Sequence, residues 1–443
     1  MSKIIRISLL IGLLLVAIVT LTAIGVGANS SQIDVLHVKG AITPPLVDYI
    51  RHGIDQAEEN YAIACIIQLD TPGGLDTSMR DIVKDIVNAQ VPVVVYVSPS
   101  GSRAASAGVF ITMAAHVAAM APNTAIGAAH PVAIGTEGEA EISEAMEEKV
   151  VNDAAAYIRS IASAHGRNME WAEKAVRESV SATEQEALEL NVIDMVAPNL
   201  DALVAQLDGR QVTMLDGSMV TLDTQGASIN SVKMSLIEDF LYAIADPNIA
   251  YILLSLAMLG LMVEISNPGL IFPGVVGGIC LLLAFYSLGM LPVNYAGVLL
   301  IVLAFGLFIG EVLTTTFGLF TAGGITSLII GSLILFKGGP LFQIDPWLIA
   351  TVAILVGGLF AFILNQVIRA HRRQAYTGRE ELIGKTAVVK VALEPEGTVF
   401  LKGERWTAVS ETGRVEPEET VIITKVDGLK LYVTKKTIKE VNK

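Results

Sequence analysis

Apolar and polar residues follow two recurring patterns between residues 32 and 235. Short strand patterns cover residues 33–38, 62–69, 91–97 and 116–120. Helical patterns cover residues 44–60, 77–88, 152–164 and 170–178, and residues 123–131 follow neither pattern, so a loop is expected there. Because strands and helices alternate along this part of the chain, an α/β domain is predicted.

A dense apolar block follows and divides into five segments, at residues 249–265, 270–290, 295–313, 317–336 and 347–368. Each segment approaches the ~20 apolar residues that a helix needs to cross a bilayer. Turn-forming Pro, Gly and Asn residues separate them. Residues 249–368 are therefore expected to form an α-helical transmembrane region of about five helices. Glu264 and Glu311 fall at segment ends, where acidic side chains are expected to reach the membrane interface.

Alternation returns in residues 378–443. Five short strands are expected, at residues 386–392, 397–401, 405–410, 420–426 and 429–434, with Gly, Glu and Pro turns between them. So many short strands in such a small domain predict an all-β barrel.

The first 28 residues have the features of a signal peptide or an N-terminal anchor. Lys3 and Arg6 precede an apolar run over residues 7–26, and small residues end it near Ala28. Residues from about 32 onward are thus expected outside the cytoplasm. Five crossings would bring the C-terminal domain inside, and Arg369 at the end of the last segment agrees with the positive-inside rule.

Composition and charge support this division. The chain is 52% hydrophobic and only 17% charged, which is too apolar for an ordinary soluble protein. Residues 31–240 carry 12 basic and 29 acidic residues, a net charge of −17, which argues against binding to nucleic acid or anionic lipid. The two cysteines, Cys65 and Cys280, fall in a strand and in an apolar segment, so neither a disulfide framework nor a cysteine metal site is expected.

Ser106 is the candidate nucleophile. It stands in the sequence Arg-Ala-Ala-Ser-Ala-Gly, between the strand at residues 91–97 and a helical run at residues 109–115. Small neighbours let a substrate carbonyl approach a serine at such a strand-to-helix turn. Free N–H groups at the helix N-terminus, Ala107 first, can hold a developing oxyanion.

A second glycine-rich site follows the buried strand at residues 62–69. The sequence Asp-Thr-Pro-Gly-Gly ends with Gly73 and Gly74, and glycine allows backbone N–H groups to come close to a ligand. Taken alone, a plain tight turn accounts for it. Together with Ser106, one of these glycine N–H groups and that of Ala107 could form an oxyanion hole.

These motifs together resemble the NfeD family, ClpP-class membrane serine proteases. The resemblance rests on Asp-Thr-Pro-Gly-Gly, on Ser-Arg-Ala-Ala-Ser-Ala-Gly and on Met-Ala-Pro-Asn-Thr-Ala-Ile-Gly-Ala at residues 120–128, and it covers the whole chain. It implies a ClpP/crotonase-like fold for residues 32–235, an OB-fold for residues 378–443 and a serine–lysine dyad. It also implies dimerisation of the protease domain or a higher oligomer.

The resemblance assigns the base to Lys149. This residue precedes an aromatic–Ile–basic element, Tyr157 to Arg159, by eight positions, as the family's catalytic lysine does. A lysine base must be largely neutral when it accepts a proton. Asp153, one helical turn onward on the same face, would favour the charged form. Without the resemblance, Lys149 would be taken for a surface lysine.

His130 is the alternative base. It lies 24 positions after Ser106 and precedes a proline, as the histidine of ClpP does, and histidine needs little tuning to act near neutral pH. Asp153 and Asp194 are possible acid partners for it. His130 could also only line the site.

The leading expectation is a membrane-anchored serine endopeptidase without metal or cofactor. The resemblance implies hydrophobic target segments in stomatin-like (SPFH) membrane proteins. The alternative is a non-catalytic membrane scaffold for a stomatin-like partner. The C-terminal domain has few aromatic residues and a near-neutral charge, so a protein partner is expected for it rather than single-stranded nucleic acid.

Overall fold

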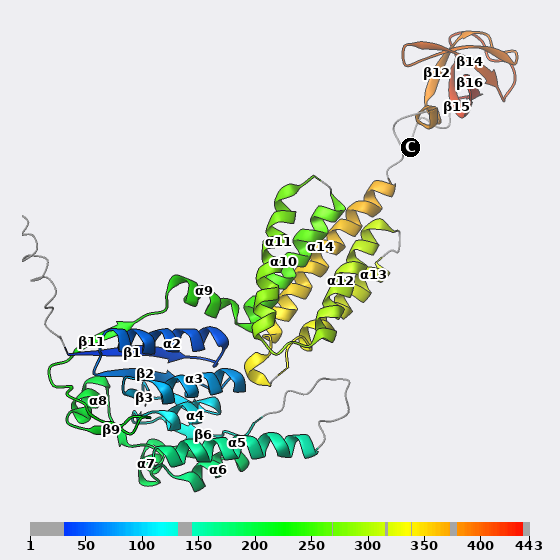
Figure 1. Cartoon of the computed structure of the whole chain (residues 1–443). Coiled ribbons are helices and arrows are strands. Elements are labelled where there is room, and N and C mark those ends of the chain that lie inside the picture. The colour runs from blue at the N-terminus through cyan, green and yellow to red at the C-terminus, as the bar shows by residue number, and fades with distance from the viewer. Residues whose placement is uncertain are drawn as a thin grey trace, which may run out of the picture. The chain divides into compact units, whose positions relative to one another are not determined.

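A computed structural model describes residues 31–131, 144–267, 269–314, 318–337, 339–372 and 379–436. The predicted signal segment, residues 1–28, lies outside them. The chain divides into two compact units between Gly357 and Gly358. The first unit holds the α/β domain and most of the apolar helices, and the second holds the C-terminal barrel (Figure 1).

A six-stranded parallel sheet forms the centre of the α/β domain, in the order β11-β1-β2-β3-β5-β8. Its strands are β1 (Gln32–Lys39), β2 (Ala64–Asp70), β3 (Val93–Val97), β5 (Val117–Met120), β8 (Met195–Val196) and β11 (Ser228–Val232). The four strands that the sequence pattern predicts are all present. Helices between them carry the chain back to the start of the next strand, as parallel pairing requires.

Each strand buries alternate side chains on opposite faces of the sheet. Leu36 and Val38 pack into one core, beneath α2 (Pro44–Glu59), α3 (Asp76–Asn88) and α4 (Ala107–Ala114). Ile33 and Val35 pack into a second core, on the face covered by α8 (Leu200–Leu207) and the hairpin of β9 (Gln211–Thr213) and β10 (Met219–Thr221). Burial on both faces explains why these strands are almost continuously apolar.

A second, small sheet carries the candidate nucleophile. It contains β4 (Arg103–Ala105), β6 (Ala125–Gly127) and β7 (Ser181–Thr183), with β4 parallel to β6 and β6 antiparallel to β7. The expected loop at residues 123–131 is therefore wrong in part, because β6 lies within it. The two sheets and their covering helices confirm the predicted α/β domain.

Three helices follow β6 and cover the first core. They are α5 (Glu144–Ala164), α6 (Met169–Arg177) and α7 (Glu184–Glu189). Helix α5 begins eight residues before the predicted start at residue 152. Helix α7 begins with a capping box: the Thr183 side chain accepts from the N–H of Glu186, and the Glu186 carboxylate accepts from the N–H of Thr183.

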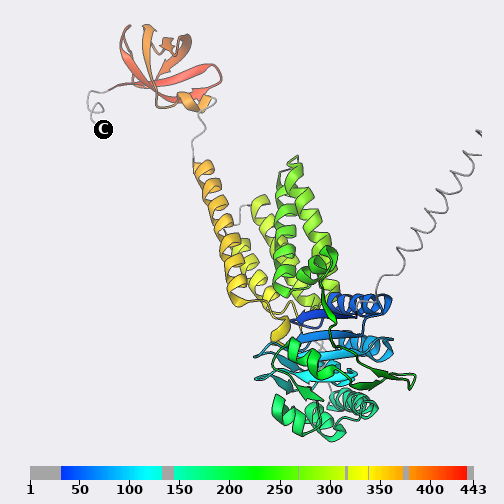
Figure 2. The same cartoon turned by 90° about the vertical axis from the view of Figure 1, so that its left-hand side faces the viewer.

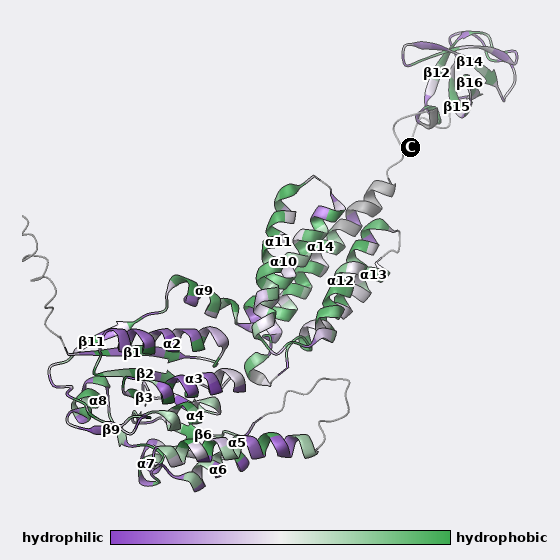
Figure 3. Cartoon of the chain, viewed as in Figure 1, coloured by the Kyte–Doolittle hydropathy of each residue, from purple (hydrophilic) through white to green (hydrophobic). Residues whose placement is uncertain are grey.

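Helices occupy all five predicted apolar segments, and most of their residues are apolar (Figure 3). They are α10 (Pro247–Ser266), α11 (Ile271–Met290), α12 (Tyr295–Leu313), α13 (Leu319–Leu333) and α14 (Pro346–Arg372). Among the described residues, α10, α11 and α12 are long and apolar enough to cross a membrane, whereas α13 and the apolar part of α14, Pro346–Phe362, are shorter. Helix α9 (Leu236–Ile244) connects the α/β domain to α10.

Glu311 does not sit as an exposed interfacial acid. Its side chain is buried, and its carboxylate accepts hydrogen bonds from the N–H groups of Gly318 (2.8 Å) and Thr321 (3.0 Å). These groups belong to the start of α13, whose first N–H groups have no acceptor within the helix. Glu311 therefore acts as a side-chain cap for a neighbouring helix.

The second unit contains a closed barrel in the order β12-β13-β14-β16-β15. Its strands are β12 (Thr386–Val391), β13 (Glu396–Leu401), β14 (Glu404–Ser410), β15 (Thr420–Asp427) and β16 (Lys430–Lys435), preceded by the short helix η2 (Arg379–Leu382). Each lies within two residues of its predicted range. Val389, Val399, Val421 and Val433 are among the inward-facing residues that form its core. The predicted five-stranded, OB-like barrel is confirmed.

Candidate active site

Ser106 stands between β4 and α4 in a conformation that few residues other than glycine adopt. Its backbone angles are φ 52° and ψ −113°. Its N–H donates to the carbonyl of Gly127 in β6 (3.1 Å), and its carbonyl accepts from the N–H of Val109 (3.0 Å). The small sheet and the first turn of α4 thus hold the serine in a strained position. Strain of this kind is typical of nucleophiles on sharp strand-to-helix turns.

The end of β2 packs directly against this turn. Thr71 donates its N–H to Arg103 (2.8 Å) and accepts from the N–H of Ala105 (3.1 Å), so β4 runs beside it. A Cβ atom on Gly108 would lie 2.7 Å from Cγ2 of Thr71. Glycine at position 108 therefore allows α4 to approach the end of β2, which brings the next residues of that turn to Ser106.

Those next residues are Gly73 and Gly74. Gly73 has φ +120°, and a Cβ atom there would lie 2.8 Å from Cβ and 3.2 Å from Oγ of Ser106. A Cβ atom on Gly74 would lie 2.3 Å from the backbone oxygen of Ile42. Two separate close approaches thus require this glycine pair, and the structure brings the predicted turn against the predicted nucleophile.

The two glycine N–H groups differ in what they bind. The N–H of Gly73 donates to Oγ1 of Thr71 (3.0 Å). The N–H of Gly74 has no acceptor among the described residues. Ala107 is the first residue of α4, so its N–H has no acceptor within the helix. The N–H groups of Gly74 and Ala107 are therefore not bound to another group among the described residues.

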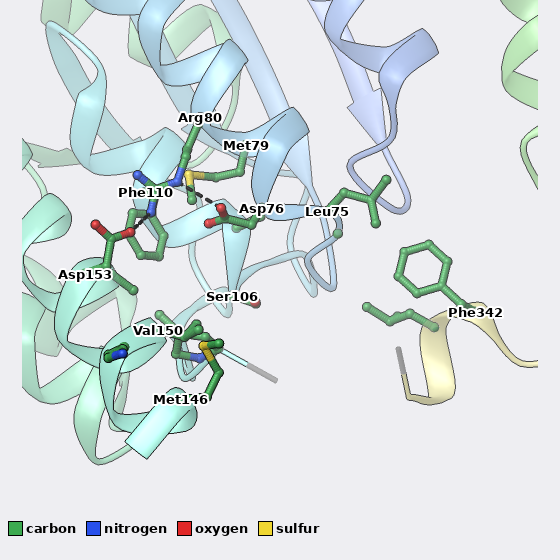
Figure 4. Close-up of a pocket in the computed structure, with 17 residues that line it drawn as sticks. Leu75, Asp76, Met79, Arg80, Ser106, Phe110, Met146, Val150, Asp153 and Phe342 are labelled. Atoms are coloured by element: carbon green, nitrogen blue, oxygen red, sulfur yellow. Dashed lines mark hydrogen bonds and ion pairs between the residues drawn. The ribbon is translucent and has the colours of Figure 1, made fainter. Parts of the chain in front are cut away.

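A pocket of about 610 Å³ opens next to Ser106 (Figure 4). Residues of α3, α4 and α5 line it, together with Leu341 and Phe342 from the short helix η1 (Pro340–Phe342) that precedes α14. Most of its wall is apolar; the apolar lining residues are Leu75, Met79, Ala107, Phe110, Ala129, Pro131, Met146, Val150, Ala154, Leu341 and Phe342. The pocket suits an apolar segment laid across the serine.

Lys149 lines this same pocket. It lies on the first half of α5, where its side chain is exposed. The structure therefore brings Ser106 and Lys149, 43 positions apart in the sequence, to one cavity.

Asp153, expected to hold the charge of Lys149, has a different partner. It forms an ion pair with Arg80 of α3, which also binds Asp76 (2.9 Å). The Arg80 guanidinium lies 4.5 Å from the centre of the Tyr157 ring. Burial lowers the pKa of Arg80, but its hydrogen bonds and charge contacts with the two carboxylates outweigh this, so the pKa rises. A cation thus neutralises Asp153 at the edge of the pocket, where Figure 4 shows the two side chains meeting.

His130 has its ring engaged elsewhere. Its Nδ1 lies 2.8 Å from the carbonyl oxygen of Val176, so this nitrogen carries the proton, and its Nε2 lies 4.0 Å from a carboxylate oxygen of Glu147. Its neighbours Ala129 and Pro131 line the pocket, whereas His130 is not among the described lining residues. Of the two candidate bases, Lys149 is therefore the one among the described residues that line the pocket.

Asp194 cannot serve His130, because its carboxylate has structural partners. It accepts from the guanidinium of Arg167 (2.7 Å) and from the N–H of Ala118 (2.7 Å). Arg167 is 5% exposed and also donates to two carbonyl groups at the end of α4. This group joins α4, β5 and β8, and it has a structural role.

Two histidines pack beside Arg167. The rings of His116 and His165 meet edge to face, with their centres 6.0 Å apart. Burial, together with the nearby charge of Arg167, lowers the pKa of each to about 4. Neither ring lines the pocket in the described structure. The two histidines therefore pack within the domain, away from the described pocket lining.

Sequence reasoning missed Arg80 and Phe342 as pocket residues. The ion pair between Arg80 and Asp76 could have been predicted, because Asp76 lies one helical turn before Arg80 on α3. The ion pair of Arg80 with Asp153 joins residues 73 positions apart, and nothing in the sequence indicates it. Phe342 lies in the apolar region at residues 249–368, and nothing in the sequence indicates that it lines a pocket of the α/β domain.

Three family models match the chain. A model described as the N-terminal domain of NfeD1b matches residues 32–232, and the NfeD integral membrane domain matches residues 248–366. The NfeD-like C-terminal, partner-binding domain matches residues 379–435.

Two curated proteins are similar over almost their whole length. Membrane-bound protease PH1510 of Pyrococcus horikoshii is 39% identical over 410 residues, 90% of this chain and 92% of that protein. Membrane protein NfeD1b of Bacillus subtilis is 28% identical over 455 residues, 95% of this chain and 97% of that protein.

Solved structures resemble parts of the chain. One is the 1510-N membrane protease specific for a stomatin homolog from Pyrococcus horikoshii, 34% identical, with a TM-score of 0.42; the match covers 48% of this chain and 99% of that one. Another is a variant of a membrane-bound stomatin-specific protease, 1510-N, in complex with a substrate peptide, also 34% identical, with a TM-score of 0.45. That match covers 48% of this chain and 98% of that one.

Proposed function

Since the chain belongs to the NfeD family of membrane proteins, we propose that it is a membrane-bound serine endopeptidase that cleaves apolar segments of a stomatin-like partner. In this proposal Ser106 is the nucleophile and Lys149 is its base. Gly74 and Ala107 supply the oxyanion hole.

The observation that carries the proposal is the contact between the glycine turn and the serine. Gly73 lies so close that a single added methyl group would meet Ser106. Gly74 and Ala107, whose N–H groups have no acceptor among the described residues, line the same pocket as Ser106 and Lys149. A nucleophile, a base and paired N–H donors around one cavity are what acyl transfer needs.

The chemistry proceeds in two halves. Oγ of Ser106 attacks the peptide carbonyl carbon while Nζ of neutral Lys149 takes the hydroxyl proton. The carbonyl oxygen becomes an oxyanion that accepts from the N–H groups of Gly74 and Ala107. Collapse breaks the C–N bond, and the leaving amine takes the proton from Lys149. Water then attacks the acyl-enzyme with Lys149 as base again, releasing the acid and restoring Ser106.

Lys149 is exposed, and a lysine can act as a base only in its neutral form. An apolar substrate that fills the pocket would remove water from Lys149 and so favour its neutral form. Arg80 supports this step, because it neutralises the Asp153 carboxylate that would otherwise attract the lysine charge. His130 remains the alternative base, which would require its ring to leave the carbonyl of Val176.

The substrate class follows from the pocket and the relatives. Apolar side chains from α3, α4, α5 and η1 would bind a hydrophobic stretch on either side of the cleaved bond. Relatives of this chain are named as proteases specific for stomatin. A stomatin-like membrane protein is therefore the proposed substrate, and the C-terminal barrel, which matches a partner-binding domain, is proposed to bind a protein partner.

The test uses the full-length protein in detergent or nanodiscs with a fluorogenic hydrophobic peptide. Ser106→Ala is expected to abolish cleavage, and a phosphonate label should map to Ser106. Lys149→Ala should reduce turnover about as far as Ser106→Ala, because members of a catalytic unit act together. His130→Ala is the matched control and should cleave normally.

Each of the other results has a distinct meaning. Cleavage by Ser106→Ala at the wild-type rate would exclude the serine mechanism. Loss of activity in His130→Ala with retention in Lys149→Ala would assign the base to His130. A wild-type protein that binds a stomatin-like partner but neither cleaves nor accepts the label would favour the scaffold alternative.

We also propose that the α/β domain lies outside the cytoplasm and the barrel inside it. The basis is the predicted signal segment and the odd number of predicted spans. Labelling of single surface cysteines in intact cells by an impermeant maleimide tests this: Tyr61→Cys in the α/β domain should react and Leu429→Cys in the barrel should not.

A further inference from the structure

Helix α9 carries three apolar side chains that the protein leaves uncovered. Leu236 is 91% exposed, Ile237 71% and Phe240 48%. Phe240 lies four residues after Leu236 and three after Ile237, and residues three or four apart share one side of a helix, so the three form a single surface, here called the α9 apolar face. The two carboxylates of α9, Glu238 and Asp239, lie outside it by the same spacing.

The opposite side of α9 is fixed to the α/β domain. The Glu238 carboxylate meets Nδ1 of His52 on α2 (3.1 Å), and the Tyr242 hydroxyl donates to the carbonyl of Lys39 at the end of β1 (2.6 Å). These contacts set the rotation of α9 about its own axis. The α9 apolar face therefore points away from the α/β domain.

The C-terminal end of α9 is attached to the membrane helices. The carbonyl of Ile244 accepts from the hydroxyl of Ser287, one turn before the end of α11. Asp246 then caps α10, which begins at Pro247. Figure 1 and Figure 2 show α9 between α2 and the adjoining ends of α10 and α11. Helix α9, which carries the α9 apolar face, thus adjoins α10 and α11, two of the helices that are long and apolar enough to cross a membrane.

Exposed aromatic residues mark the level of the bilayer surface at this end. Tyr295 is 79% exposed at the first residue of α12, and Trp347 is 82% exposed at the second residue of α14. The N–H of Asp345, just before α14, donates to the side chain of Asn248 in the first turn of α10 (2.8 Å), so both helices start at one edge. Tyr and Trp concentrate where membrane helices leave the hydrocarbon core.

We propose that α9 lies in the interface of the bilayer on the side of the α/β domain, with the α9 apolar face against lipid. The occupant is the bilayer, because α9 adjoins the spans and lies at the level of the aromatic residues. Burial of apolar area drives the contact. The α/β domain is strongly acidic, so attraction to anionic lipid has no part in it. This inference does not depend on the proposed peptidase activity.

The experiment places a nitroxide label on single cysteines of the full-length protein in phosphatidylcholine liposomes. The background carries Cys65→Ala and Cys280→Ala. Ile237→Cys reports on the α9 apolar face, and Phe285→Cys, 55% exposed on α11, is the lipid reference. Tyr61→Cys, 86% exposed on the α/β domain, is the water reference. Collision rates with oxygen, which enriches in lipid, and with a polar nickel complex, which stays in water, are compared.

The label on Ile237→Cys should show an oxygen-to-nickel ratio well above that on Tyr61→Cys and closer to that on Phe285→Cys. Addition of phosphatidylglycerol should leave the ratio unchanged, and Phe240→Asp should lower it. A ratio equal to that of Tyr61→Cys would overturn the proposal. Spin–spin broadening at Ile237→Cys that disappears on dilution with unlabelled protein would also overturn it, by showing that a second copy covers the face.

Discussion

Replacing Gly73 by alanine should separate catalysis from folding in this protein. The added methyl group would lie 2.8 Å from Cβ and 3.2 Å from Oγ of Ser106, and neither neighbour is the end of a flexible chain. Ser106 must therefore move. The hydrogen bond to Gly127 and the first turn of α4 fix the position of Ser106. Any movement of Ser106 away from the added methyl group would therefore change the orientation of its side chain.

Two magnitudes follow from this geometry. An alanine at φ +120° costs roughly 1–3 kcal/mol of folding free energy. A displacement of Ser106 by an ångström or less is expected to lower kcat/KM about 100-fold, since nucleophilic attack depends steeply on position. The first effect is shared with any strained glycine, and the second is specific to Gly73.

Gly101 provides the matched control. It also has a positive φ, +90°, and it lies in the loop before β4, but a Cβ atom there would meet nothing within 4 Å. Gly73→Ala and Gly101→Ala should lose similar thermal stability, and only Gly73→Ala should lose peptide cleavage and phosphonate labelling. If Gly73→Ala cleaves the peptide at the wild-type rate, the argument that the glycine turn forms part of the active site is wrong.

Three further predictions concern the surroundings of the site. Arg80→Leu should lower kcat, because Asp153, freed from its cation, would leave an unpaired negative charge in the pocket that Lys149 lines; an unchanged kcat would contradict this. His116 and His165 have folded pKa values of about 4, below their ordinary 6.5, so the unfolded state binds more protons between these values. Stability is thus complete above pH 6.5 and falls as the pH drops towards 4, by up to about 3 kcal/mol per histidine, and thermal melting of the double glutamine variant should lose this dependence. Phe342→Ser should reduce kcat/KM for a hydrophobic peptide about tenfold in the full-length protein, as expected for loss of one apolar contact, and should leave cleavage of a short polar peptide unchanged.

The elements with long, regular patterns could be predicted from the sequence. The central strands are buried on both faces, and the barrel strands alternate, so periodicity alone located them. The position of Ser106 just before a helix could be predicted as well, because small residues there separate a strand pattern from a helical one. Strand β6 could not, since three residues carry no period and form a strand only by pairing with β4 and β7.

The arrangement around the serine required the structure. The sequence offered both glycines as oxyanion donors, and only the hydrogen bond from Gly73 to Thr71 distinguishes Gly74. The sequence left two candidate bases, Lys149 and His130. The hydrogen bond between the His130 ring and the carbonyl of Val176 could not be predicted, because Val176 lies on a helix 46 positions away. From the sequence, Asp153 was expected to favour the charged form of Lys149. Its ion pair with Arg80 could not be predicted, because that contact depends on how α3 and α5 cross. Such long-range contacts leave no trace in local patterns.

The pairing of β11 with β1 has a consequence for biosynthesis. Strand β1 is the first of the domain to be made, and one of its edges stays bare until Ser228–Val232 arrives, almost two hundred residues later. An unpaired edge is prone to join other chains. Strand β11 ends at Val232 and α10 begins at Pro247, so the sheet is completed only as the first membrane helix is being synthesised. Assembly of the α/β domain and insertion into the bilayer are thereby timed together. A fragment cut before Ser228 should expose that edge and aggregate.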